Sequence, residues 1–189
     1  MATISNLPFR SLIYGVDLRL QIREGEAALI YSYDLDPSTW DSGLAISIQT
    51  QSSQDSPLAS AARLDIRAIR TVTQSLSAWD SIIGIDFREK EAEENKVAQL
   101  HIGYTDWHMN SNSLGYAWGP LQGTYAGSVW LNKRLTGLDF SQSDISALLH
   151  FTVLHEIGHA LGLKHPHEAS PLNDDILYML IYIIMHANN

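Results

Sequence analysis

The stretch HEIGHALGLKH, residues 155–165, decides how this chain is organised. In a helix, side chains four positions apart lie on one face, so His155 and His159 should point the same way. Two imidazoles at this spacing can bind one zinc ion. Glu156 lies beside them, where it can reach a water molecule on the metal without being a ligand. The stretch therefore predicts a metal centre carried by a helix.

Gly162 and His165 complete this predicted centre. Glycine adopts the left-handed conformation that ends helices at little steric cost, so Gly162 lets the chain turn back. His165 then becomes a third ligand, and a fourth position left open for water is typical of a catalytic zinc site. His167 is a second candidate, but the spacing from the glycine favours His165. The alternative, a helix with ordinary surface or core histidines, is disfavoured by five fixed residues in one pattern.

The pattern H-E-x-x-H-x-x-G-x-x-H resembles that of the metzincins, zinc endopeptidases with a third histidine after the glycine. Pro166, directly after His165, makes the chain similar to the serralysin branch. The resemblance covers roughly residues 26–166 and is strongest over 143–166. It implies an α+β fold of the zincin or metzincin type, with a twisted mixed sheet, two long helices and a small C-terminal subdomain.

Hydrophobic periodicity predicts the elements around the motif. Strands are expected near residues 29–34, 44–48, 83–87, 98–104 and 127–132, and a turn-rich loop at 115–120. Helices are expected over 58–82 and 143–161, the second with Ser141 or Ser143 as its N-cap. Short apolar groups between polar residues indicate that residues 1–25 are a leader or pro-segment, and residues 26–189 are then the catalytic domain.

Residues outside the motif offer weaker candidates. His101 and His108 are scattered, which is more typical of surface or hydrogen-bonded histidines than of ligands. His150 lies five residues before His155, a poor spacing for one helix face. The resemblance places the strand near 127–132 at a sheet edge along which a substrate lies extended, so a substrate cleft is expected at Val129, Trp130 and Leu131. Core packing of the aromatic residues here is an equal alternative.

Metzincins place a methionine in a tight turn beneath the zinc ligands. The resemblance implies this supporting role for Met185, at the end of the apolar run 176–185, with Met179 as the alternative. The run is shorter than the ~20 residues that span a bilayer. The family pattern has a tyrosine two residues after the methionine, where this chain has Ala187. A helix normally follows as well, so the catalytic domain is expected to be truncated at its C-terminal end.

The composition narrows the class of protein. The chain has 189 residues, enough for one domain with its own core, and no cysteine, which excludes disulfides and thiolate zinc sites. Its net charge is −9 without a basic cluster, so a nucleic-acid partner is not expected, whereas Ca²⁺ binding is compatible with the charge. No signal peptide is visible, and the serralysin resemblance implies a secreted protein.

We therefore expect a monomeric zinc metalloendopeptidase that acts on protein or peptide substrates. Zn²⁺ is the expected cofactor, held by the three motif histidines, and Glu156 is the expected general base and acid. The alternative is a zinc-binding but non-proteolytic interaction or adhesion module with an incomplete active site. A turnover assay with and without a chelator separates the two.

Overall fold

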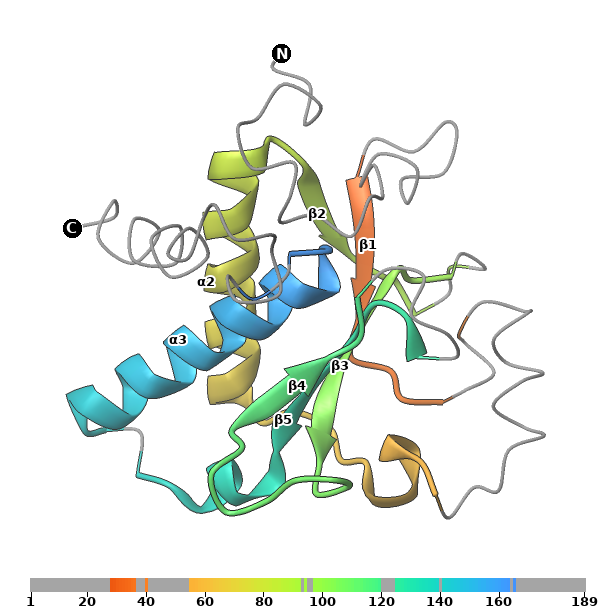
Figure 1. Cartoon of the computed structure of the whole chain (residues 1–189). Coiled ribbons are helices and arrows are strands. Elements are labelled where there is room, and N and C mark those ends of the chain that lie inside the picture. The colour runs from red at the N-terminus through yellow and green to blue at the C-terminus, as the bar shows by residue number, and fades with distance from the viewer. Residues whose placement is uncertain are drawn as a thin grey trace.

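The structure is a computed structural model that describes residues 28–36, 40, 55–92, 94, 97–119, 125–139, 141–163 and 165. A five-stranded sheet and two long helices make up most of this part of the chain (Figure 1). The expectations for residues 1–25, 44–48 and 166–189 lie outside the described residues. They include the leader, the C-terminal subdomain and the methionine beneath the histidines.

The sheet is mixed, and its strands follow the order β2-β1-β3-β5-β4. The strands span Ala28–Ser32 (β1), Asp86–Glu89 (β2), Leu100–Thr105 (β3), Gly115–Ala117 (β4) and Ser128–Asn132 (β5). β1 pairs in parallel with β2 and β3, β3 pairs in parallel with β5, and β4 alone runs antiparallel, along β5. With the two long helices, this confirms the predicted α+β class and mixed sheet.

The edge of the sheet differs from the prediction. β5 lies between β3 and β4, and Val129, Trp130 and Leu131 are each 0% exposed. The prediction that β5 is the edge strand is therefore wrong, and the core-packing alternative describes these side chains. The edge strand next to β5 is β4, in the segment predicted as a loop, and β2 is the edge strand on the other side of the sheet. A three-residue strand that begins with glycine is too short to show the alternation of apolar residues that marks a strand.

The helix predicted over 58–82 begins later than expected. Residues Pro57–Ser60 form a separate 3₁₀ turn, η5, and α2 spans Ile66–Ile83. Between them, Ala62 exchanges two backbone hydrogen bonds with Tyr104 of β3, at 2.9 and 2.8 Å. This pairing requires extended backbone, so the apolar residues before Ile66 belong to a segment that pairs with β3.

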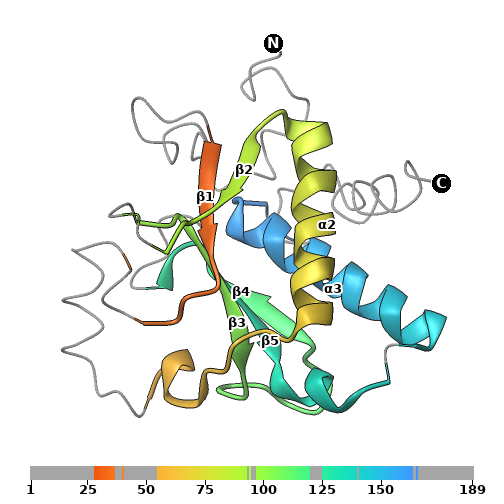
Figure 2. The ribbon, with the colours of Figure 1, turned by 180° about the vertical axis from the view of Figure 1, so that it is seen from behind.

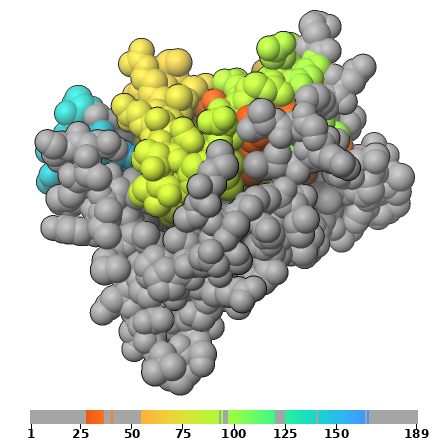
Figure 3. Space-filling model, turned by 90° about the horizontal axis from the view of Figure 1, so that it is seen from above, coloured from red at the N-terminus to blue at the C-terminus, as the bar shows by residue number. Residues whose placement is uncertain are grey.

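Both ends of α2 have clear local causes. The Asp65 carboxylate accepts hydrogen bonds from the backbone N–H groups of Arg67 and Ala68, at 2.8 and 3.2 Å, and so caps the N-terminus. At the other end Gly84 adopts a φ of 63°, the left-handed conformation typical of a helix C-terminus. β2 consequently begins after this turn rather than at residue 83. Seen from above, α2 and β2 adjoin on the surface (Figure 3).

α3 spans Ser143–Ala160, close to the predicted helix over 143–161. Its N-cap is Gln142, whose side chain makes no capping hydrogen bond, so neither predicted serine occupies that position. The indole N–H of Trp79 in α2 donates to the backbone carbonyl of Leu154, at 3.2 Å, in the turn of α3 before the motif. This buried contact joins the two helices.

The sheet separates two hydrophobic clusters. On one face, α2 and α3 cross each other and bury the apolar side chains of β1, β3 and β5, among them Leu29, Ile102 and Leu131 (Figure 2). A smaller aromatic cluster contains the buried rings of Trp40 and Trp130. β3 has Leu100, Ile102 and Tyr104 in the first cluster, whereas His101 stacks on Trp40.

Candidate metal centre

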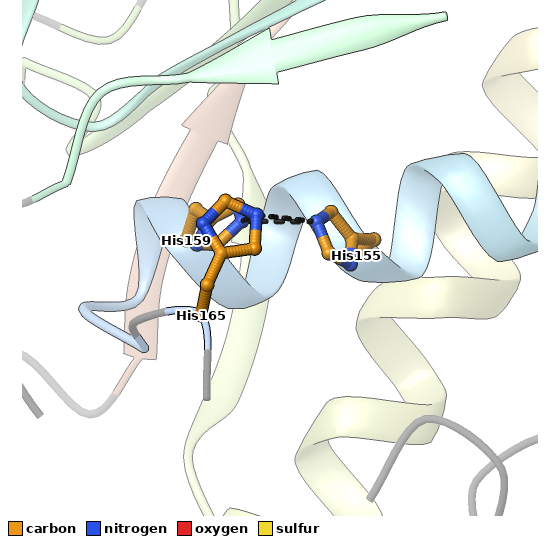
Figure 4. A group of neighbouring side chains, drawn as sticks. All are labelled: His155, His159 and His165. Carbon is orange, nitrogen blue, oxygen red and sulfur yellow. Dashed lines mark hydrogen bonds between the residues drawn. The ribbon is translucent and has the colours of Figure 1, made fainter. Parts of the chain in front are cut away.

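Three histidine side chains converge at the C-terminal end of α3 (Figure 4). His155 and His159 project from successive turns of the helix, and His165 reaches them from the segment that follows. The Nε2 atom of His159 lies 3.0 Å from that of His155 and 3.1 Å from that of His165, and the third distance, between His155 and His165, is 3.3 Å. Among the described residues these three histidines form the one group with metal-binding geometry.

The three nitrogen atoms fit a zinc ion. Zinc takes imidazole nitrogens at 2.0–2.1 Å in a tetrahedron, which places any two of them about 3.3–3.4 Å apart. The separations of 3.0 to 3.3 Å are close to that spacing. The residues present therefore suit a three-histidine zinc site.

The turn that brings His165 back depends on Gly162. This glycine has a φ of 99°, in the left-handed region that other residues avoid. The N–H of Gly162 donates to the carbonyl of His159, at 2.8 Å, and the N–H of Leu163 donates to that of Gly158, at 2.9 Å. Together these bonds form a Schellman motif, a common C-terminal end of a helix. The helix ends as the sequence predicts.

The same turn orients the ring of His159. Its Nδ1 atom lies 2.7 Å from the backbone carbonyl oxygen of Leu163. A carbonyl oxygen can only accept, so Nδ1 carries the hydrogen and, in the neutral ring, Nε2 keeps its lone pair for a metal. The turn after α3 thus fixes both the position of His165 and the tautomer of His159.

Burial governs the ionisation of the neighbouring groups. Burial, with smaller contributions from the charges of His159 and His165, lowers the pKa of His155 to about 4. This ring is therefore neutral at pH 7, the form that binds metals. Burial also raises the pKa of Glu156 to about 8 in the metal-free protein. A divalent cation beside this carboxyl group stabilises the charged form and acts in the opposite direction.

The other histidines considered in the sequence lie elsewhere. His101 is buried, stacks on Trp40 with ring centroids 4.0 Å apart, and places Nδ1 3.3 Å from the carbonyl oxygen of Asp34. His108 is exposed and stacks on Trp107. His150 is half-buried on α3 and does not belong to the three-histidine group.

The edge strand β4 is a part of the candidate site that the sequence did not predict. β4 packs against α3, and Gly115 lies next to the side chains of Glu156 and Thr152. The sequence signal for it is weak, because a Gly-Tyr-Ala segment between turn residues looks like a loop. Met185 lies outside the described residues, and its supporting role stays a prediction.

Fold and site together define a metzincin-like metallopeptidase domain: a mixed sheet, two helices, and three histidines on the second helix and its following turn. The family model described as Matrixin matches residues 49–188, which is more than half of the chain. The chain therefore belongs to the matrixin family.

Individual relatives agree with the predicted resemblance to serralysins. Serralysin G of Dickeya chrysanthemi is 32% identical over 102 residues, covering 52% of this chain and 21% of that protein. Serralysin B of the same organism is 33% identical over 107 residues, covering 55% of this chain and 22% of that protein. Metalloendoproteinase 4-MMP of Arabidopsis thaliana is 28% identical over 155 residues, covering 78% of this chain and 43% of that protein. The matches thus span about a fifth of the serralysins' length.

The alignment with the solved structure of myroilysin covers 67% of this chain and 58% of the myroilysin chain, at 22% identity and a TM-score of 0.43. None of the described helices is both long and apolar enough to cross a membrane.

Proposed function

We propose that this chain is a zinc-dependent endopeptidase domain. The observation that carries the proposal is the convergence of three histidine Nε2 atoms at the end of a helix in which a buried glutamate, Glu156, directly follows His155. His155, His159 and His165 would hold the metal, and Gly162 supports them by shaping the turn. Met185 is proposed as a further support beneath them.

Glu156 would move the proton that peptide hydrolysis requires. When bound, zinc lowers the pKa of a water molecule and polarises the scissile carbonyl. The Glu156 carboxylate accepts the proton of the attacking water and donates it to the leaving amine, acting as base and then as acid. Glu156 is only 8% exposed, so little bulk water competes for this proton.

The edge strand β4 offers a place for the substrate backbone. Leu114 accepts a hydrogen bond from Asn132, at 2.8 Å, and Trp118 donates to Ser128, at 2.9 Å, so the backbone groups of these residues point toward β5. Alternation along an antiparallel strand then directs the backbone groups of Gly115 and Ala117 outward. A peptide that pairs with them would lie extended next to the metal centre, with little dependence on its sequence. This placement replaces the cleft predicted at Val129–Leu131.

The wider proposal follows the family resemblance. Residues 26–189 would form the catalytic domain, which would act on protein or peptide substrates. The protein would be a monomer and would be secreted. The relatives named serralysin support this proposal, although the matches cover only part of their length.

Turnover of an unstructured protein, with and without a chelator, tests the proposal. We expect hydrolysis that disappears with the chelator and returns with Zn²⁺. Glu156→Gln keeps the shape of the side chain but removes the base, so it should retain zinc and lower turnover by at least ~100-fold. Zinc bound without any hydrolysis would instead support the non-proteolytic module. Unchanged turnover in Glu156→Gln would contradict the role of Glu156.

A further inference from the structure

Gly115, the first residue of the edge strand β4, lies so close to α3 that a Cβ atom there would make unusually tight contacts. A Cβ atom built on Gly115 would lie 3.0 Å from Cγ of Glu156 and 3.0 Å from the backbone oxygen of Trp130. It would also lie 3.4 Å from Cγ2 of Thr152. Contacts of 3.0 Å are tighter than the optimum of about 3.5–4.0 Å between carbon atoms, so a neighbouring group would have to move by a few tenths of an ångström.

The backbone of Gly115 gives no other reason for a glycine. Among the glycines that the structure describes, Gly84, Gly127 and Gly162 have positive φ values, and Gly115 does not. Its conformation is that of an ordinary strand residue, which any amino acid adopts. Glycine inside a strand weakens it and commonly marks a close approach of another group. Here that group is the side chain of Glu156.

We propose that Gly115 is a positioning residue for Glu156: the absence of a side chain on the edge strand lets β4 lie directly against the methylene groups of this glutamate and fixes the direction of its carboxylate. The inference rests on the proposed function, because it assigns Glu156 the role of base. Glu156 is buried, and its neighbours Gly115 and Thr152 come from two different elements. A methyl group at residue 115 would push the flexible glutamate side chain, because the Trp130 carbonyl is held in the sheet.

Gly115 also has backbone groups that point toward the proposed substrate, so its replacement could act through substrate pairing instead. The two routes differ in what they change. Misplacing the base lowers kcat, since the proton transfer depends on its geometry. Disturbing the pairing weakens binding of substrate and raises KM, and it does so whether or not Glu156 is present as a base.

The first experiment measures the contact through thermal unfolding of metal-free protein. Gly115→Ala should lower Tm by about 3–10 °C, the shift expected from overpacking an interior in a chain of this size. In a Glu156→Ala background, which removes the crowded methylene groups but leaves the contact with the Trp130 carbonyl, the same change should lower Tm by less. The matched control is Gly137→Ala, because a Cβ there meets nothing within 4 Å and should leave Tm unchanged or slightly higher.

The second experiment measures turnover by the zinc-loaded protein. Gly115→Ala should lower kcat by ~10–100-fold, the scale of misplacing a catalytic group by an ångström or less, with KM changed less than ~3-fold. Zinc content should equal that of the unmodified protein. In a Glu156→Gln background, Gly115→Ala should cause no further loss, because residues that act as one unit are not additive.

The outcomes separate this inference from the proposed function. Equal Tm losses in the two backgrounds would overturn the contact, and equal losses of turnover, or a rise in KM alone, would overturn the positioning role in favour of substrate pairing. A chain that hydrolyses no peptide would overturn the proposed function together with the catalytic part of the inference. The thermal experiment would still decide whether β4 and Glu156 are packed as described.

Discussion

The two long helices have the same length, 18 residues each, but they are stabilised in different ways. α2 has a side-chain cap at Asp65, a left-handed glycine at its end and one buried stripe that includes Val72, Leu76 and Trp79. α3 lacks a side-chain cap at its start, and its second half is buried nearly all round. Among residues 151–160, only Phe151, His155 and His159 are partly exposed.

The partly exposed residues Phe151, His155 and His159 follow each other at intervals of four, so they form a single line along α3. His155 and His159 of this line face the proposed metal, and the remaining surface of the segment packs into the core. α2 is thus an amphipathic helix that local signals can start and stop, whereas α3 depends on packing from the sheet and from Trp79. Changes on α2 should therefore affect stability alone, and changes along the exposed line of α3 should affect zinc.

The largest effect is expected at the exposed line. His159→Ala should lower zinc affinity by at least ~100-fold, because removing a zinc ligand weakens binding more than removing a residue that only hydrogen-bonds to a ligand. His150→Ala is the control on the same helix, since this half-buried histidine is outside the group and should keep its zinc. Chelator competition measures both. Similar affinities in the two variants would remove the distinction between the exposed line and the rest of α3.

A smaller effect is expected at the start of α2. Asp65→Ala removes the cap and the acceptor for the Tyr104 hydroxyl, so the free energy of unfolding should fall by about 0.5–2 kcal/mol. Zinc affinity should not change. Chemical denaturation and chelator competition measure the two quantities, and a large loss of zinc would mean that α2 is coupled to the metal centre.

The contribution of Asp65 should depend on pH. Burial alone would raise its pKa, but hydrogen bonds from the N–H groups of Ala68 and Arg67 and from Tyr104 outweigh burial and lower the pKa below its ordinary value. The stabilisation is therefore complete above the unfolded pKa of about 3.9 and is lost as the pH falls through the lower folded value. Asp65→Asn keeps a cap without this titration. Chemical denaturation of the unmodified protein and of this variant at several pH values measures the difference in their free energies of unfolding. Any advantage of the aspartate should become smaller in acid. A difference that stays constant with pH would contradict the role of the Asp65 charge.

The smallest effect is expected at the start of α3. Gln142 has extended backbone, with φ −79° and ψ 127°, but its side chain makes no capping bond. Gln142→Ser should therefore add about 0.5–1 kcal/mol to the free energy of unfolding, with Gln142→Ala as the uncapped control. Zinc affinity should stay the same, because the metal centre lies at the other end of the helix. If Gln142→Ser does not raise the free energy of unfolding, the backbone N–H groups at the start of α3 already have other hydrogen-bond acceptors.

Local signals explain which elements the sequence could predict. α3 and its C-terminal turn follow from hydrophobic spacing and from one glycine, and the strands β1, β3 and β5 follow from runs of β-branched and aromatic residues. The start of α2 was predicted too early because Ala62 pairs with Tyr104, which is distant along the chain, and this pairing overrides the helical spacing of its neighbours.

The sequence by itself determined the candidate metal centre, because His155, His159, Gly162 and His165 lie within one short stretch, and one helical turn with its end fixes their geometry. Only the tertiary structure decided which strand is the edge and what covers Glu156. β4 and α3 are separate in the chain, and their contact depends on the order of strands across the whole sheet. Strand order is set by long-range pairing, for which a single segment carries no periodic signal.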